Sequence, residues 1–343
     1  MLRNILFITI VLITVSCVKD KPQNPVQPQV QLSNNKKVYI VNEGNFMSSN
    51  SSVSLYDPGN LQVIENFYST QNNNAVLGDV AQSINYFNSG FYIVVNNSNK
   101  IVVCDNQFKY KTVINGFTSP RYILPVSNSK AYVSDLYSNN IKVVNLNLNS
   151  VTSSIPCQGW TEQMALVYNK AYVTNLKKNF LYVINTLTDQ KTDSISIGPN
   201  AGSLTVDKFD KVWVLSAGDK TASIAPTLRK IDPLTNQVET TLTFPLLDSP
   251  GSLCINKTKD TLYYLNGGIF RMPVNSASIP STAFIDKVNK TFYGLGINPN
   301  DYTIYASDAL DYIQKSNIYV YDMNANQKTF FKAGTNANSF YFE

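Results

Sequence analysis

The side chains that could do chemistry in this sequence are carboxylates, amides, a few cations and aromatic rings, because its 343 residues include no histidine. Without imidazole there is no serine–histidine or cysteine–histidine nucleophile and no histidine-ligated zinc. A carboxylate-only enzyme, such as a lactonase or lyase, would need Glu43, Glu162 or Asp79 close together near a channel with shifted pKa values. We therefore expect a protein that binds rather than one that catalyses.

The candidate binding residues lie in the segments that connect short apolar runs. They are amides, acids, two aromatic residues and one arginine: Asn42, Asn45, Phe46, Asp79, Asn97, Arg121, Asp135, Trp160, Glu162, Asn175 and Asn200. Together they would line a shallow basin of amides, a few charges and aromatic surface. Such a basin suits a large neutral polar ligand held by hydrogen bonds and stacking. It suits hydrolysis or phosphoryl transfer poorly.

Some of these residues have a structural alternative. Asn and Asp at strand ends commonly stabilise turns through hydrogen bonds to the backbone. Asn42, Asp135 and Asn175 recur at matching positions of a repeat, which favours that role for them over ligand contact.

Other residues lie outside the regular runs. Trp160, Arg121 and Phe46 stand in connecting segments, where binding and packing are equally open alternatives. Asp308 and Asp311 lack the glycine and distal glutamate of a calcium loop, so we interpret them as solvated acids. No metal site is predicted, and no cofactor beyond a bound ligand.

The candidate residues are set on a pattern that recurs about every 40 to 50 residues. Its clearest copy is residues 171–185, in which two alternating β-branched and aromatic runs flank a short turn, as in a β-hairpin. The aromatic residue of the first run recurs at Tyr39, Tyr92, Tyr132, Tyr172, Trp213, Tyr263 and Tyr305. A third run follows each pair and a fourth precedes the next aromatic. Four short strands per period, seven times, predict an all-β, seven-bladed β-propeller.

The ends of the repeat predict how the propeller closes. The chain enters the first blade at residues 36–42 with no innermost strand before it, and a matching run appears at residues 337–342. A C-terminal strand that completes the first blade would remove an open sheet edge. The propeller is therefore predicted over residues 36–343. The sixth period departs from the others at residues 269–273, which end on proline rather than Asp or Asn.

Four long connections are predicted to lie on one face of the propeller. In each blade the loop between the second and third strands shares a face with the link to the next blade. Residues 42–50, 66–79, 216–227 and 307–317 all belong to such connections. Because irregular loops on a rigid scaffold commonly carry binding, we expect the site on this face.

The N-terminal residues predict where the protein is located in the cell. Residues 1–16 hold Arg3 and a short apolar run, the layout of a secretory signal peptide. Cys17 follows a small residue, as in the lipobox of lipoproteins whose cysteine is lipidated; the alternative is an ordinary signal with an incidental cysteine. Residues 17–35, with three prolines, are expected to form an extended tether. Membrane contact would be through the lipid anchor only.

Charge and the remaining cysteines exclude other classes. The formal net charge of +5 is spread thinly along the chain, whereas nucleic-acid binding needs clustered Lys and Arg. We expect no nucleic-acid partner. Cys104, Cys157 and Cys254 have neither disulfide-framework nor metal-ligand spacing. Cys104 and Cys254 lie inside strand runs, which makes them small core residues.

Several segments resemble a known group. Residues 172–175 spell YVTN, as in bacterial surface-layer propeller repeats, and the chain resembles the YncE-like propellers. Further segments resemble secreted propeller lipoproteins of outer-membrane nutrient uptake: NEGN at 42–45, LGDV at 77–80, NNSNK at 96–100, PRY at 120–122, AYV at 131–133 and SDA at 307–309. Within that branch the BtuG-like type captures cobalamin at the cell surface and passes it to a TonB-dependent transporter. The resemblance spans about residues 36–343.

The resemblance implies a non-enzymatic, lipid-anchored outer-membrane protein at the cell surface. Its ligand would be cobalamin, cobinamide or a similarly large nutrient, and its partner a TonB-dependent transporter. Without histidine, cobalt would receive no imidazole from the protein, so binding would rest on the corrin periphery. The alternative is a surface propeller that binds a protein or a cell-wall glycan and no small molecule.

Overall fold

The computed structural model describes residues 32–343, of which Ser33–Glu343 form one compact unit. The predicted signal peptide, Cys17 and most of the predicted tether lie outside the described residues. Within the described residues, no helix is long and apolar enough to cross a membrane. The regular secondary structure of this part of the chain is almost entirely β-strand, as predicted.

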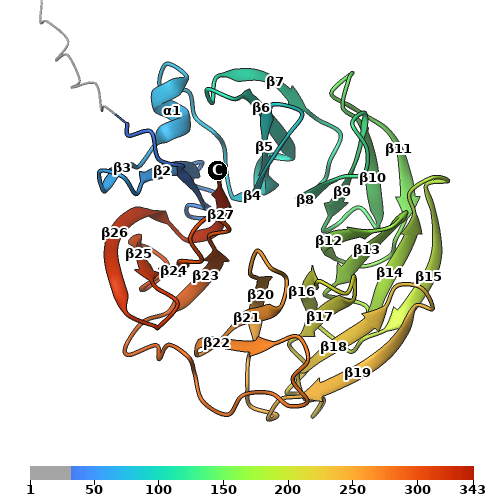
Figure 1. The fold of residues 1–343 in the computed structure, drawn as a ribbon. Helices are drawn as coiled ribbons and strands as arrows, with labels where there is room; N and C mark the ends of the chain where they lie inside the picture. Colours follow the sequence, from blue (N-terminus) through green and yellow to red (C-terminus); the bar gives the residue numbers. More distant parts are fainter. Residues whose placement is uncertain (1–31) are drawn as a thin grey trace, which may run out of the picture. The chain divides into compact units, whose positions relative to one another are not determined.

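The strands form seven antiparallel sheets arranged around a central channel (Figure 1). From the channel outward, blade one contains β27 (Ala337–Phe342), β1 (Val38–Asn42), β2 (Ser52–Asp57) and β3 (Gln62–Ile64). Blade two contains β4 (Ala81–Phe87), β5 (Gly90–Val95), β6 (Lys100–Asp105) and β7 (Tyr110–Ile114). Blade three contains β8 (Pro120–Pro125), β9 (Lys130–Asp135), β10 (Asn140–Asn145) and β11 (Ser150–Pro156).

Blade four contains β12 (Thr161–Val167), β13 (Lys170–Asn175), β14 (Phe180–Asn185) and β15 (Gln190–Ser196). Blade five contains β16 (Ala201–Val206), β17 (Val212–Ser216), β18 (Thr227–Asp232) and β19 (Gln237–Thr243). Blade six contains β20 (Gly251–Ile255), β21 (Thr261–Asn266) and β22 (Gly268–Pro273). Blade seven contains β23 (Phe292–Ile297), β24 (Ile304–Asp308), β25 (Lys315–Tyr321) and β26 (Gln327–Thr335). The predicted seven-bladed propeller is confirmed.

The predicted closure is also confirmed. β27 pairs antiparallel with β1, with Val38 opposite Phe342 and Ile40 opposite Phe340. β27 also packs beside the innermost strands of both neighbouring blades, β4 and β23, so the ring of innermost strands is complete. The two ends of the described chain therefore meet in a single sheet.

The structure departs from four strands per blade in one place. Blade six has three, and the following segment pairs with the blade through an isolated bridge between Ile269 and Ile285, while Phe284 and Ile285 pack against its core. The proline that ends β22 has no N–H for a further ladder, which agrees with the break in the repeat. Blade one has a different irregularity: β3 is short, and helix α1 (Phe67–Gln71) covers its flank with two buried aromatic residues.

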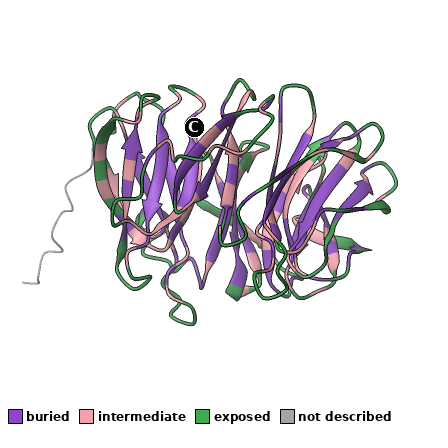
Figure 2. Cartoon of the chain, turned by 90° about the horizontal axis from the view of Figure 1, so that it is seen from below, coloured by how far each residue is buried: buried purple, intermediate pink, exposed green. Residues whose placement is uncertain are grey.

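The recurring aromatic residue of each blade packs against the next blade. All seven are buried, and Trp213, for example, packs with Leu262 and Phe270 of blade six. Tyr305 packs with Val38 and Tyr56 of blade one, so the contact also spans the closure. Figure 2 shows the result, with buried residues along the strands and exposed residues in the connecting loops.

A polar side chain at the end of the second strand ties each of several blades to the link that enters it. These link clamps are Asn42, Asp135, Asn175 and Asp308, and each accepts a hydrogen bond from a backbone N–H of the link or, for Asn42, of the end of β26 just before it. The N–H groups are those of Gly334, Ser119, Trp160 and Thr291, at 3.0, 3.0, 3.1 and 2.8 Å. The first three clamps have no exposed surface, and Asp308 is also buried, so its interpretation as a solvated acid was wrong. Their geometry is that of the turn-stabilising alternative.

Replacing Asn42 tests how much the stability of the closed propeller depends on a link clamp. Its Oδ1 accepts from Gly334, and its Nδ2 donates to Ser54 Oγ at 3.0 Å. Asn42→Ala leaves buried polar groups without partners, so we expect the free energy of unfolding to fall by about 2–4 kcal/mol. Urea denaturation measures it. The exposed turn residue Asn106 provides the control, since Asn106→Ala should stay within about 0.5 kcal/mol of wild type. Equal stability of the two variants would contradict the clamp.

Candidate functional site

Every innermost strand carries a β-bulge at the same place. The pairing register of each shifts directly after its first residue, as between Ala81 and Ser83 in β4 or Pro120 and Ile123 in β8. A bulge frees a residue from the ladder and re-aims its side chain. The residues freed at the second position form what we call the channel ring: Asn338, Gln82, Arg121, Glu162, Gly202, Ser252 and Tyr293. Each of these residues lies near the start of its innermost strand, next to the link from the previous blade.

The centre of the channel ring is an ion pair. Arg121 Nε donates to Glu162 Oε1 at 2.8 Å, and Nη1 donates to Gln82 Oε1. Glu162 is almost fully buried, whereas a fifth of the Arg121 side chain remains exposed. Burial raises the pKa of Glu162, and the charge of Arg121 opposes that shift. The predicted site residues Arg121 and Glu162 therefore lie together, in the channel and not in an open basin.

Glu43 joins the ring from the loop that follows β1. Its two oxygens accept hydrogen bonds from Tyr293 Oη at 2.9 Å and from Asn338 Nδ2 at 2.6 Å. Burial raises the pKa of Glu43, and these two hydrogen bonds and the charge of Arg121 counteract the rise. Two carboxyl groups with raised pKa values thus flank one guanidinium, the arrangement that the carboxylate hypothesis required for Glu43 and Glu162. Asp79 takes no part in it.

The ring opens into a cavity of about 340 Å³. Its lining combines polar ring residues with the side chains of neighbouring strand positions, among them Tyr122, Gln163 and Phe340. Hydroxyl, amide and charged groups therefore surround a space of the size that small molecules occupy in proteins.

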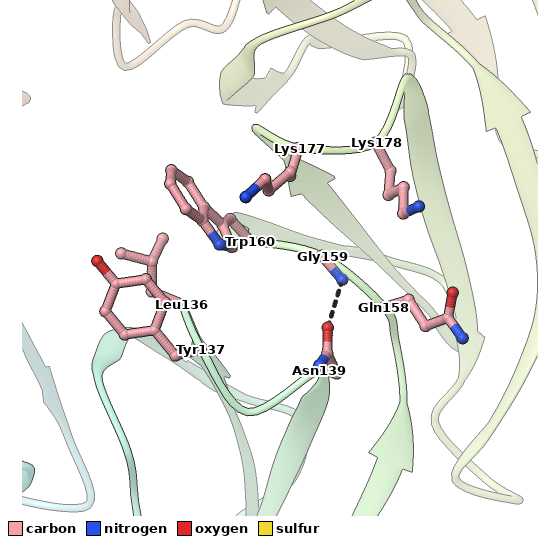
Figure 3. A pocket seen from close by; sticks show the side chains of 8 residues that line it. All are labelled: Leu136, Tyr137, Asn139, Gln158, Gly159, Trp160, Lys177 and Lys178. Atoms are coloured by element: carbon pink, nitrogen blue, oxygen red, sulfur yellow. Dashed lines mark hydrogen bonds between the residues drawn. The ribbon is translucent and has the colours of Figure 1, made fainter.

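A second hollow lies between blades three and four on the face of the long loops. We call it the aromatic shelf; it has a volume of about 530 Å³ and is lined by Leu136, Tyr137, Asn139, Gln158, Gly159, Trp160, Lys177 and Lys178 (Figure 3). The rings of Tyr137 and Trp160 meet edge to face, with centroids 5.7 Å apart. Lys177 Nζ lies 4.4 Å from the centre of the indole ring. The shelf thus offers flat apolar surface beside two cations.

Two link clamps hold the shelf in place from below. Asn175 Oδ1 accepts hydrogen bonds from the backbone N–H groups of Trp160, Lys177 and Lys178, at 3.1, 2.9 and 2.9 Å. Asp135 Oδ1 accepts from the N–H of Tyr137 at 3.3 Å. Asn175 and Asp135, which the sequence placed among the binding residues, therefore position the shelf without facing it.

The remaining predicted residues lie elsewhere on the loops. Asp79 Oδ2 accepts from the N–H of Met47 at 2.9 Å and from Asn97 Nδ2 at 2.6 Å, which fixes the loop that exposes Phe46. Asn45 Nδ2 donates to the carbonyl of Tyr312 at 3.1 Å.

Asn200 stands apart in blade five, where its Nδ2 donates to the carbonyl of Gly218 at 2.7 Å. The structure therefore divides the predicted basin among a channel, a shelf and separate loops.

Sequence reasoning missed most of the channel ring and, of the shelf, predicted only Trp160. Gln82, Tyr293 and Asn338 occupy the same blade position as Arg121, so aligning the seven repeats on their innermost strands would have grouped them. Tyr137 follows a link clamp by two residues, and this spacing is the signal that would have paired it with Trp160.

The pH dependence of stability tests the environment of Glu43. Because burial raises its folded-state pKa above the unfolded value, the folded state holds the proton more tightly. Stability contributed by this group is present at low pH and lost as pH rises through the raised pKa. Glu43→Gln has no such loss, so its melting temperature relative to wild type should increase from pH 4 to pH 7. Glu65→Gln, at an exposed ion pair with Lys315, is the control. A pH-independent difference would refute the raised pKa.

Comparisons with solved structures place the fold among known propeller-like chains. A quinonprotein alcohol dehydrogenase-like protein from Bacteroides thetaiotaomicron superposes with a TM-score of 0.73 at 12% identity, over 90% of this chain and 79% of that chain. A protein from Lactobacillus plantarum gives 0.66 at 12% identity, over 90% and 99%. Hydrazine synthase from Kuenenia stuttgartiensis gives 0.62 at 12% identity, over 76% and 88%. At this identity the likeness concerns the fold alone.

Sequence comparison identifies a family. No curated protein matches the chain. The family model described as a domain of unknown function (DUF5074) matches residues 36–342, from just before the first strand to the last residue of β27. The chain therefore belongs to the DUF5074 family.

Proposed function

We propose that this propeller is a non-enzymatic binding protein that captures a large, flat, polar ligand on the aromatic shelf. The observation that carries the proposal is the pairing of Tyr137 and Trp160 beside Lys177 in an open hollow. Aromatic residues give large contact areas at low conformational cost, and Trp and Tyr dominate many binding sites. Here Tyr137 is exposed and Trp160 is only partly buried.

A corrinoid is the ligand class that this proposal favours. The corrin ring is broad and flat, and its amide-bearing periphery can accept and donate hydrogen bonds to polar loops. The phosphodiester of cobalamin would lie well beside two lysines, Lys177 and Lys178. The resemblance of the loop motifs to BtuG-like lipoproteins supports the same class. On this proposal the protein is held at the outer membrane through lipidated Cys17 and hands the ligand to a TonB-dependent transporter.

The alternative function is a surface contact with a protein or a cell-wall glycan. Aromatic shelves also stack on sugar rings, so the same hollow favours a glycan among these partners. Titration of the chain separates the two functions: corrinoid binding supports nutrient capture. Binding of peptidoglycan fragments with no response to corrinoids would instead support the cell-wall contact and contradict nutrient capture.

The first prediction concerns the aromatic pair. Isothermal titration with cobalamin should give one-to-one binding, and Trp160→Ala should weaken it by about 2 kcal/mol, or about 30-fold, because a stacked ring is lost. Tyr137→Ala should weaken it in the same direction. The matched control is Tyr168→Ala on the opposite face, since Tyr168 is 55% exposed and Tyr137 is 57% exposed. If all three variants bind alike, the shelf is not the site.

The second prediction concerns the two lysines. Replacing both Lys177 and Lys178 by Ala should weaken cobalamin binding by about 1 kcal/mol, or about fivefold, and reduce its salt dependence, because an exposed charge contact is removed. Cobinamide, which lacks the phosphodiester, should bind the double variant and wild type similarly. Lys208→Ala is the control, because Lys208 also lies over an exposed ring, at 5.3 Å from the centroid of Phe209. Equal losses for both ligands would argue against phosphate recognition.

A further inference from the structure

We propose that the channel ring and Glu43 form a second binding site, which takes a small hydroxylated ammonium compound of the amino-sugar class. The site is separate from the aromatic shelf in position and in chemistry. It consists of polar side chains on bulged innermost strands around one cavity, together with a carboxylate from the loop after β1.

Of the described charged groups in the channel, one carboxylate has no cationic partner. Arg121 forms an ion pair with Glu162. Glu43, in contrast, has no cation within ion-pair distance among the described residues, and its partners are the neutral donors Tyr293 and Asn338. A nearby positive charge strongly favours the ionised form of a buried carboxyl group. A ligand ammonium group would supply that charge.

The lining favours an organic cation over a metal ion. Tyr122, Tyr293 and Phe340 line the cavity, and aromatic faces attract ammonium groups. Within residues 32–343, no group of three or more metal-ligating side chains occurs, whereas calcium takes six or more oxygen ligands.

Polar atoms without a hydrogen-bond partner favour a ligand that carries hydroxyl groups. The Oδ1 atom of Asn338 is buried and has no hydrogen-bond partner. Arg121 bonds through Nε and Nη1, and its Nη2 makes no hydrogen bond within the described part of the chain. A hydroxyl group both donates and accepts, so a polyhydroxylated ligand satisfies an acceptor and a donor at once. The cavity of about 340 Å³ admits one monosaccharide ring.

The test compares two sugars that differ in one group. Isothermal titration of the full chain with glucosamine and with glucose measures the contribution of the ammonium group. Glucosamine should bind one-to-one and at least tenfold more tightly than glucose. Equal affinities, or no binding of glucosamine up to about 10 mM, would overturn the proposal.

Glu43→Gln assigns the ammonium contact. It should weaken glucosamine at least tenfold and leave cobalamin unchanged, because cobalamin is proposed to bind the shelf. Glu65→Gln, which removes an exposed carboxylate outside the channel, should bind glucosamine like wild type. Unchanged glucosamine affinity in a folded Glu43→Gln protein would overturn the proposal. The corrinoid titrations do not depend on this outcome, so the two sites can fail separately.

Discussion

The propeller depends on one long-range pairing, between β1 and β27. This pairing removes the open edge that β1 would otherwise present, and open edges invite pairing with other chains. It also completes the channel ring, because Glu43 follows β1 whereas Asn338 lies in β27, and the two meet only after closure. A contact between residues so distant in sequence forms against a large loss of chain entropy. The channel is therefore organised by the contact that finishes the fold.

Much of the fold could be predicted because each period carries a physical requirement. An aromatic residue on the second strand must fill the space between blades, so Tyr132, Tyr172 and Trp213 recur in register. Asp or Asn at the end of the third strand must accept turn N–H groups, as Asp105 and Asn145 do. These demands act within one blade and its neighbour, and they are visible as a period in the sequence. The three-stranded sixth blade was visible only as a departure from it.

The site could be predicted only in part, because it depends on features that the repeat pattern of the sequence does not show. Alternation along β8 does not reveal that a bulge turns Arg121 into the channel, since the bulge shifts the register by backbone geometry alone. Polar residues at strand ends were ambiguous for a related reason. Asn175 is conspicuous in the sequence, yet it is buried and holds the backbone of Trp160, which lines the shelf and is only partly buried.

The two hollows differ in what they can select. The aromatic shelf is open and lies between loops, so it can accept part of a ligand much larger than itself. The channel ring surrounds a cavity of about 340 Å³, and its network of buried polar groups is not explained by stability. Replacing a buried ion pair by apolar residues is often neutral or stabilising, and a carboxylate such as Glu43 without an ion pair is a greater cost. An apolar plug at seven equivalent bulges would close the channel more simply. Six different side chains and one glycine at equivalent positions instead support the asymmetric occupant that we propose.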